Sequence, residues 1–313
     1  MPPLRIGLVS AATYQYLDQP IRHGSNHGTA FASTFNGFDE AEVKQHEWTF
    51  VRSKKRIEGA KVVKVWDNHR DWATRLARAC DIRTVCETPE ECCEGVDVVI
   101  IVDDGSGEQS KYAKYSLEKG IPTFCDKPLA MTARKAREVA QLVRRTGTPF
   151  MSASSLRFVP DIIALKDQVA KIGPVHLAQT ICGNELVYYG IHALSMAYAV
   201  LGPGAISAVN VGSPDRNIVR IRFKDDREVV LMVAGRDWMR GGYEIGVYGK
   251  KGWVTVKPDL KDLYWYLLMA FMDYVQSGKE VVPVEEEVEL IAALEAGKRS
   301  LEEKREVLIS EVL

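Results

Sequence analysis

Two strand ends near the N-terminus carry residue types that could bind a dinucleotide. The first strand-like run ends at Ser10, and a G-x-G-x-x-G fingerprint would place its glycines at Ser10, Ala12 and Gln15. Serine and alanine are small enough to let the backbone approach a pyrophosphate, whereas Gln15 is not a neutral replacement. Ser10, Ala11, Ala12 and Thr13 therefore form either an altered phosphate-binding loop or an ordinary turn between a strand and a helix.

Asp67 ends the second strand-like run, Lys61–Asp67 (KVVKVWD), where a carboxylate can accept hydrogen bonds from both ribose hydroxyls of an adenosine. A carboxylate there would repel a 2′-phosphate, so we expect NAD rather than NADP. The motif usually separates glycines and acid by about 20 residues, and the separation here is far longer. The excess lies in residues 14–59. Within it we interpret Ser25–Phe35 as a displaced crossover helix whose N-terminus could bind an anion.

The other reactive side chains are less informative. No cysteine pair has C-x-x-C spacing with a histidine in register, so we predict buried thiols and no metal site. His23 and His27 are interpreted as loop or capping residues, and the basic run 52–56 as a solvated loop. The six cysteines are Cys80, Cys86, Cys92, Cys93, Cys125 and Cys182.

Length and composition limit the possible functions. The chain has 313 residues, with 41 Lys plus Arg, 42 Asp plus Glu and a formal net charge of −1. This balance excludes a global attraction to nucleic acid or to an anionic membrane. No apolar run reaches the roughly 18–20 residues that cross a bilayer, and the N-terminus shows no signal peptide. We therefore expect a cytoplasmic protein with neither nucleic-acid nor membrane partners.

The first half alternates β-branched runs with amphipathic helical patterns, which is typical of parallel strands joined by crossover helices. Strands are expected at 4–10, 61–67, 96–102, 122–125 and 149–153. Helices are expected at 69–80, at 109–119 and from the N-cap Thr132 to Gly147.

After about residue 155 the short turns between strands favour antiparallel pairing. Helices are expected at 159–171, 190–201, 262–276 and 285–303, and strands at 175–182, 208–212, 218–224, 228–234, 244–248 and 253–256. The sequence thus predicts an α/β protein with a Rossmann-type parallel sheet in residues 1–127 and linking elements in 128–155. Residues 156–313 would form an α+β domain with an open, mainly antiparallel sheet, whose C-terminal helix could pack back on the first domain.

Three short motifs occur in the order in which one known family carries them. Asp126-Lys127-Pro128 resembles the acid-Lys-Pro motif of the glucose–fructose oxidoreductase / inositol dehydrogenase (Gfo/Idh/MocA) family, usually Glu-Lys-Pro. Residues 155–160 (SLRFVP) are similar to the family's Arg-aromatic-x-Pro start of the second domain. Gly190-Ile191-His192 is similar to its Gly-x-His segment. The resemblance covers essentially the whole chain.

The resemblance implies that Lys127 lies beside the nicotinamide and the substrate hydroxyl, where its ammonium would stabilise a developing alkoxide. It implies that His192 is the general acid or base, a role suited to the near-neutral pKa of imidazole. Arg157 and Arg236 are candidates for binding the substrate, the latter beside Trp238, although that pair could equally form an interface. The open sheet of this family usually packs against another subunit, so a homodimer or homotetramer is expected.

Two segments depart from the family's pattern. Tyr188 stands four residues before the histidine, where many members have an aspartate. A phenol can hydrogen-bond or act as an acid, but it supplies no fixed negative charge at neutral pH. Residues 103–108 (DDGSGE) replace a Thr-Pro-x-x-x-His stretch in the expected cofactor loop. There Asp103 and Asp104 would repel phosphates unless they are paired or turned away.

The leading hypothesis is an NAD-dependent oxidoreductase that transfers a hydride between a nicotinamide and a sugar, polyol or related hydroxy compound. NAD would lie across residues 10–13, Asp67 and residues 102–105. Lys127, His192 and Tyr188 would surround the reacting hydroxyl. One alternative is a lyase, isomerase or hydrolase in the same cleft. Another is a cofactor-free binding protein on this scaffold, against which the retained lysine and histidine argue.

Overall fold

Two units make up the part of the chain that the computed structural model describes, residues 2–15, 19–104, 106–107 and 109–313. Unit 1 comprises Met1–Leu129, Val139–Ser152 and Tyr264–Val284. Unit 2 comprises Ala130–Glu138, Ala153–Leu263 and Glu285–Leu313. The division differs from the sequence-based boundaries chiefly in Tyr264–Val284, a segment late in the chain that belongs to unit 1.

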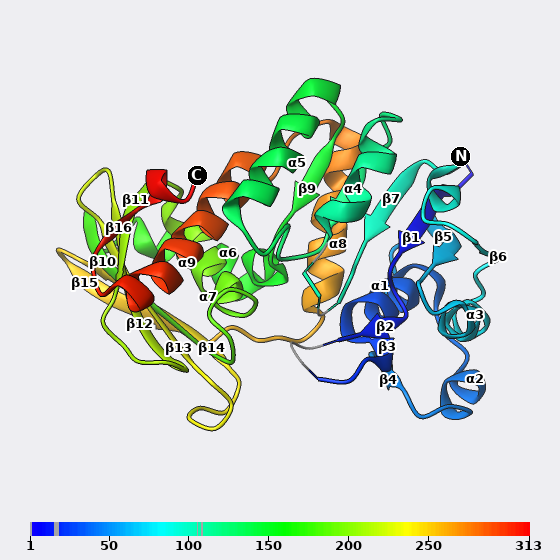
Figure 1. The fold of residues 1–313 in the computed structure, drawn as a ribbon, viewed down its shortest axis with the longest axis horizontal. Coiled ribbons are helices and arrows are strands. Elements are labelled where there is room, and N and C mark those ends of the chain that lie inside the picture. Colours follow the sequence, from blue (N-terminus) through cyan, green and yellow to red (C-terminus); the bar gives the residue numbers. More distant parts are fainter. Residues whose placement is uncertain (1, 16–18, 105, 108) are drawn as a thin grey trace. The chain divides into compact units, whose positions relative to one another are not determined.

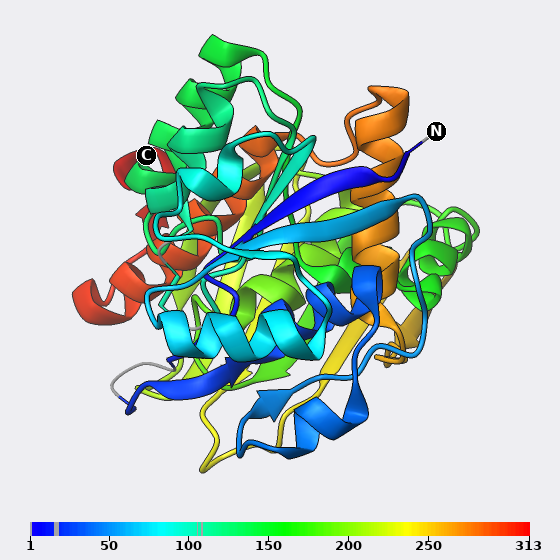
Figure 2. The same cartoon turned by 90° about the vertical axis from the view of Figure 1, so that its right-hand side faces the viewer.

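A six-stranded parallel sheet forms the centre of unit 1, in the order β6-β5-β1-β7-β8-β9. This is the strand order of a doubly wound dinucleotide-binding fold. From β1 the chain adds strands first on one side and then, from β7 onward, on the other, so the switch point lies between β1 and β7. Figure 2 shows β1 in dark blue beside β5 in light blue. The strands are β1 (Leu4–Val9), β5 (Ala60–Trp66), β6 (Thr84–Val85), β7 (Val98–Ile101), β8 (Thr123–Cys125) and β9 (Phe150–Ser152).

Aromatic side chains bind the late segment into the core of unit 1. The ring of Phe124 on β8 lies 6.0 Å from Phe31 and 5.5 Å from Phe271, and all three are fully buried. Phe271 belongs to α8, so burial of its apolar face explains why this helix returns to unit 1. The helices of this unit are α1 (Asn26–Asn36), α2 (Glu40–Lys44), α3 (Arg70–Ala79), α4 (Ser110–Leu117), most of α8 (Leu263–Ser277) and the second half of α5 (Ala133–Thr146).

The long first crossover holds the elements that the sequence did not reveal. A small sheet joins β2 (Thr13–Tyr14), β3 (Arg22–Ser25) and β4 (Thr49–Phe50). The displaced helix itself is confirmed as α1, whose N-cap Ser25 accepts a hydrogen bond from the backbone N–H of Gly28. An inserted β-hairpin therefore separates the end of β1 from the helix that would normally follow it.

A seven-stranded sheet forms unit 2, in the order β15-β14-β10-β13-β12-β11-β16 (Figure 1). Only the β10–β13 pair is parallel among its described pairs, so the predicted mainly antiparallel sheet is confirmed. The strands are β10 (Val175–Gly183), β11 (Ala205–Asn210), β12 (Arg216–Phe223), β13 (Glu228–Ala234), β14 (Tyr243–Gly249), β15 (Gly252–Val256) and β16 (Val307–Leu308). The helices are α6 (Pro160–Val169), α7 (Gly190–Leu201) and α9 (Val284–Glu303).

The two faces of this sheet differ in burial. Buried and exposed residues alternate strictly along β12, and Val233 of β13 lies against Gly190 of α7 on the buried face. Ile218 and Leu177 lie on the other face and are 43% and 44% exposed. Association through this open face stays a prediction, as does the cytoplasmic location. None of the described helices has the length and apolar character that a membrane span requires.

The six cysteines are buried and free, as the sequence predicts. Burial raises the pKa of the Cys80 thiol to about 12 and that of Cys93 to about 11, which keeps both protonated at neutral pH. These thiols therefore act as small apolar side chains of the core.

Candidate active site

The carboxylate of Asp67, at the end of β5, is hydrogen-bonded to the turn after β1. Asp67 is only 4% exposed and accepts hydrogen bonds from the backbone N–H of Ala12 (2.8 Å) and from Thr13 Oγ1 (2.5 Å). The N–H of His69 donates to the same side chain at 3.0 Å. Ser10 has a left-handed backbone conformation (φ 55°), which a glycine at this fingerprint position would adopt without strain. The predicted loop and acid are thus in direct contact.

The close approach of helix to strand is made by Gly28 rather than at Gln15, where the fingerprint spacing had placed it. A Cβ at Gly28 would stand 2.1 Å from the carbonyl oxygen of Ala11, so only glycine fits there. The hairpin inserted before α1 displaces this glycine along the sequence while leaving it beside the loop in space. The third fingerprint glycine is therefore present at a position that spacing alone could not predict.

The N-terminus of α1 is already occupied by a carboxylate of the protein. Asp104 follows β7, is 5% exposed, and accepts hydrogen bonds from Ser25 Oγ (3.0 Å) and from the backbone N–H of His27 (3.2 Å). A helix N-terminus at this edge of a Rossmann sheet is where a pyrophosphate normally binds. The negative charge of Asp104 therefore takes the place at which a phosphate would be expected.

Asp103 lies beside it in a left-handed conformation (φ 46°). The hydroxyls of Ser10 and Ser106 donate to its carboxylate, and its backbone N–H donates to the carbonyl of Ser10 at 3.0 Å. This pairing turns the Asp103 side chain toward the β1 loop. Gly105 and Glu108 of the same predicted loop lie outside the described residues.

A cavity of about 170 Å³ opens at this edge of unit 1. Asp103 and Asp104 are among its walls, together with Lys111, and it lies next to the β1 loop. The other lining residues that matter here are Ser10, Thr13, Asn68 and Tyr112. Its place, outside the carboxyl ends of the central strands, is where open α/β sheets bind their ligands.

Lys127 follows β8 and is 2% exposed. Burial lowers the pKa of its ammonium, and the negative charges of Asp126 and Asp104 oppose that shift. Asp126 Oδ2 lies 2.5 Å from Nδ1 of His27, whose ring packs 4.9 Å from that of Tyr264. The predicted lysine thus belongs to a buried polar cluster of unit 1. His27 is neither a loop residue nor a cap, because it pairs with the motif's aspartate.

His192 lies in α7 of unit 2 and is 7% exposed. Its Nδ1 lies 2.7 Å from Ser154 Oγ, and its ring meets those of Tyr189 (6.0 Å) and Tyr243 (5.6 Å) edge to face. Tyr188, proposed from its spacing, is buried, and its backbone N–H donates to the carboxylate of Glu185. Ser154, Tyr189 and Tyr243 carried no motif that could have marked them in the sequence.

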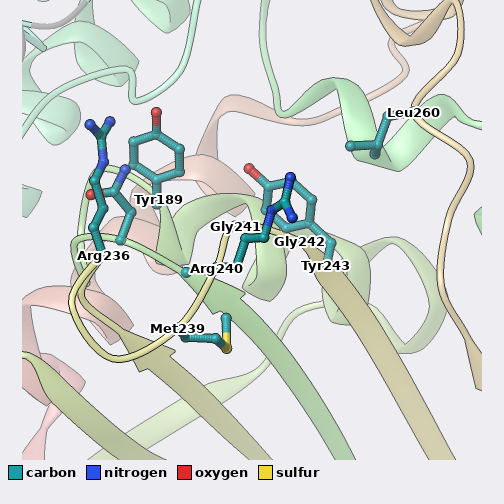
Figure 3. Close-up of a pocket in the computed structure, with 10 residues that line it drawn as sticks. Tyr189, Arg236, Met239, Arg240, Gly241, Gly242, Tyr243 and Leu260 are labelled. Atoms are coloured by element: carbon teal, nitrogen blue, oxygen red, sulfur yellow. The ribbon is translucent and has the colours of Figure 1, made fainter.

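Tyr189 and Tyr243 also line a cavity of about 480 Å³ in unit 2, drawn in Figure 3. Arg236, predicted to bind the substrate, is one of its walls, and Arg240 is another. The guanidinium of Arg216 instead lies over Trp238, with Cζ of Arg216 4.1 Å from the centre of the Trp238 ring. The structure thus brings Arg236 and the rings around His192 to one cavity.

Arg157 is directed into the interior of unit 2. Its Nη2 lies 2.5 Å from the carboxylate of Glu286, and both side chains are almost fully buried. Burial raises the pKa of the adjacent Glu287 to about 8, against the pull of the Arg157 charge. The guanidinium of Arg157 is therefore engaged in a buried ion pair, and its proposed contact with substrate stays a prediction.

Comparison with known proteins gives the class of this fold. An oxidoreductase family with an NAD-binding Rossmann fold matches residues 24–154. D-glucoside 3-dehydrogenase of Escherichia coli is 28% identical over 175 residues, covering 49% of this chain and 50% of that enzyme. Inositol 2-dehydrogenase of Rhizobium meliloti is 21% identical over 307 residues, covering 80% of this chain and 92% of that enzyme.

The solved myo-inositol dehydrogenase of Lactobacillus casei, in complex with NAD(H) and myo-inositol, shares the fold. Its TM-score is 0.77 at 15% identity, over 98% of this chain and 96% of that one. The chain is therefore an oxidoreductase with an NAD-binding Rossmann fold. The match over residues 24–154 bears out the resemblance to the Gfo/Idh/MocA family.

Proposed function

We propose that this protein transfers a hydride between NAD and a hydroxyl-bearing carbon of a sugar or polyol, with Lys127 and His192 at the reacting hydroxyl. Relatives named for inositols and glucosides support the substrate class. The observation that carries the residue assignment is the burial of Lys127 at the end of β8, on the edge where Rossmann sheets bind their ligands.

The residues of unit 1 fit the adenosine side of NAD. Asp67 would accept the ribose hydroxyls, and the turn from Ser10 to Thr13 would lie under the dinucleotide, next to the cavity at the strand ends. The close approach of Gly28 to Ala11 also belongs to this binding mode. Asp104 is the departure, and a pyrophosphate would have to lie beside its charge or displace it. When bound, the nicotinamide supplies the hydride acceptor or donor.

Lys127 would act on the substrate oxygen. As the hydroxyl loses its proton, negative charge develops on that oxygen, and a positioned ammonium stabilises it most in a water-poor site. The buried setting of Lys127 provides such a site, and Asp126 and Asp104 help to keep the lysine charged. Gln109 Nε2 donates to the carbonyl oxygen of Lys127 at 3.3 Å and so fixes its backbone.

His192 would exchange the hydroxyl proton. Its Nδ1 faces Ser154 Oγ, so we assign the exchange to Nε2. In the oxidation direction the hydroxyl proton would pass to Nε2, and the carbon that bears the hydroxyl would lose its hydride to the bound nicotinamide. The rings of Tyr189 and Tyr243 contact the imidazole edge to face and so help to hold its plane.

Enzyme assays test this assignment. The purified protein is incubated with NAD and a panel of inositols, aldoses and glucosides, and NADH is followed by its absorbance. We expect Lys127→Met and His192→Asn each to lower kcat by about 10²–10⁴-fold, as for other general acid–base groups. Exposed Lys166→Met and His176→Asn are matched controls that should retain the rate. Full turnover by either site variant would refute the corresponding role.

A further inference from the structure

The cavity of unit 2 has an unusual charge for a site that would receive a neutral polyol. Its volume of about 480 Å³ falls in the usual range of small-molecule sites, about 300–1,000 Å³. Two arginines, Arg236 and Arg240, belong to its walls. The ten residues that line it, all in the described part of the chain, include neither aspartate nor glutamate. The fixed charge of the cavity wall is therefore positive.

The carboxylates that neighbour the cavity in sequence are not part of its lining. Glu185 accepts a hydrogen bond from the backbone N–H of Tyr188, and Glu244 lies 3.4 Å from the ammonium of Lys257. Asp237, between the two arginines in sequence, is exposed and is not part of the lining. The lining of the cavity therefore contains two guanidinium groups and no carboxylate.

Both arginines are exposed, and they line the cavity together with Tyr189 and Tyr243 (Figure 3). Guanidinium and phenol groups donate hydrogen bonds, and the planar fork of arginine matches the geometry of carboxylate and phosphate oxygens. A neutral polyol needs acceptors as well as donors, whereas an oxyanion needs only donors. The two guanidinium groups, which can only donate, suit an anion better.

The anion site and the proposed acid–base group share two walls. Tyr189 and Tyr243 line the cavity and also contact the ring of His192. Gly241 and Gly242 add no side chain, and a Cβ built on either would meet no atom within 4 Å. A small molecule could therefore place one end against the arginines while another part lies near His192.

We propose that this cavity binds the oxyanion of the substrate, a carboxylate or a phosphate, through Arg236 and Arg240. The substrate class is then a sugar acid or a sugar phosphate rather than a neutral polyol. This inference rests on the proposed dehydrogenase function, since it names the substrate of that same site.

The test compares matched substrates that differ in charge. D-glucose, D-glucuronate and D-glucose 6-phosphate are each assayed with NAD for NADH formation and titrated by calorimetry. We expect at least one anion to exceed glucose in kcat/KM and in affinity by about tenfold or more, the effect of one or two charge-assisted hydrogen bonds. The two anions distinguish a carboxylate site from a phosphate site.

Variants of Arg236 and Arg240 test whether these side chains cause the preference for an anion. Arg236→Gln and Arg240→Gln should each raise KM for the preferred anion by about 10–100-fold, with a smaller change in kcat. Arg216→Gln is the matched control, because Arg216 lies over Trp238 outside the cavity lining. Circular dichroism checks that each variant is folded.

The outcomes separate the two proposals. Turnover of glucose equal to or better than that of both anions would overturn the anion site while supporting the dehydrogenase. A preference for an anion over glucose that persists when Arg236→Gln and Arg240→Gln are combined would also overturn the anion site. Arginine-dependent anion binding without NADH formation would support the anion site and count against the dehydrogenase. Absence of anion binding by calorimetry would overturn this inference.

Discussion

The two units hold their buried and exposed charges in opposite ways. In unit 1 the carboxylates of Asp67, Asp104 and Asp126 are at most 5% exposed, and each has a hydrogen-bonding partner in its own unit. In unit 2 the guanidinium groups of Arg236 and Arg240 are exposed at a cavity. These three acids of unit 1 are therefore held by groups of their own unit, whereas the two arginines of unit 2 lie exposed at the cavity where we propose that an anion binds.

A second contrast concerns buried acids alone. Glu287 of unit 2 is fully buried, and neither of its carboxyl oxygens has a hydrogen-bond partner within the described residues. A buried carboxylate without hydrogen bonds is costly, so such a group keeps its proton. Asp67 and Asp104, by contrast, accept hydrogen bonds from backbone N–H and hydroxyl groups. Hydrogen bonding, not burial by itself, therefore distinguishes Asp67 and Asp104 from Glu287.

The largest effect is expected where a buried partner is removed from unit 1. Asp126→Ala leaves Nδ1 of His27 without its carboxylate. Breaking a buried pair in this way costs about 3–5 kcal/mol of the free energy of unfolding, so the melting temperature should fall by several degrees or more. Thermal unfolding followed by circular dichroism measures it.

A surface pair provides the control for that variant. Asp97→Ala removes the partner of Arg5, whose side chain is 53% exposed, and should change the melting temperature much less. A double variant, His27→Ala with Asp126→Ala, should lose less than the sum of the two single losses. Strict additivity would show that the two side chains do not stabilise each other.

Glu287→Gln tests the second contrast through pH. The pKa of Glu287 is raised from an ordinary value of 4.5 to about 8. Between these values the unfolded chain releases a proton that the folded chain keeps, so the wild type loses stability as pH rises. The slope approaches about 1.4 kcal/mol per pH unit. The glutamine side chain stays neutral at every pH. The melting temperature of Glu287→Gln should therefore rise relative to that of the wild type from pH 5 to 8.

Exposed Glu285 on the same helix provides the comparison, since Glu285→Gln should follow the wild-type pH profile. Parallel profiles for Glu287→Gln and the wild type would mean that Glu287 is ionised in the folded protein.

Much of the fold could be predicted because its elements are bounded by local signals. The helix predicted at 190–201 and the strand at 228–234 have those limits in the structure. Apolar periodicity and a following glycine are properties of a few neighbouring residues. The hairpin of β2 and β3 was missed because its strands are short and pair largely through the backbone. The return of α8 to unit 1 depends on aromatic contacts that no local pattern records.

The candidate site shows the same limit. Lys127, His192 and Arg236 could be proposed because they stand in or near recognisable motifs. Ser154 and His27 could not, since each lies far along the chain from the group that it contacts. Gly28 was missed for a related reason: the hairpin moved it away from the fingerprint spacing without moving it away from Ala11.

Gly28→Ala and Gly241→Ala compare the space available for a methyl group beside the β1 turn of unit 1 and at the cavity of unit 2. A methyl group at Gly28 would overlap the carbonyl oxygen of Ala11, whereas at Gly241 it would meet no atom within 4 Å. Overpacking of this kind costs about 1–3 kcal/mol, so Gly28→Ala should melt at a lower temperature and Gly241→Ala should not. Equal melting temperatures would show that α1 can shift away from the β1 turn.

The smallest effect, and the sharpest test of how unit 1 tolerates a dinucleotide, is expected from Asp104→Asn. The variant keeps an oxygen that can accept from Ser25 Oγ and the N–H of His27, but it removes the negative charge at the N-terminus of α1. Two unit charges about 4 Å apart in water interact by about 1 kcal/mol, so the Kd for NAD should fall about fivefold in calorimetric titrations.

The gain from Asp104→Asn should change little in about 1 M salt, because a buried charge is screened much less than an exposed one. Asp71→Asn, at an exposed position of α3, makes the same charge change and should leave the Kd unchanged. Weaker binding by Asp104→Asn would mean that this carboxylate orders the helix N-terminus for the cofactor instead of competing with it. The acids of unit 1 would then serve the ligand as directly as we propose for the arginines of unit 2.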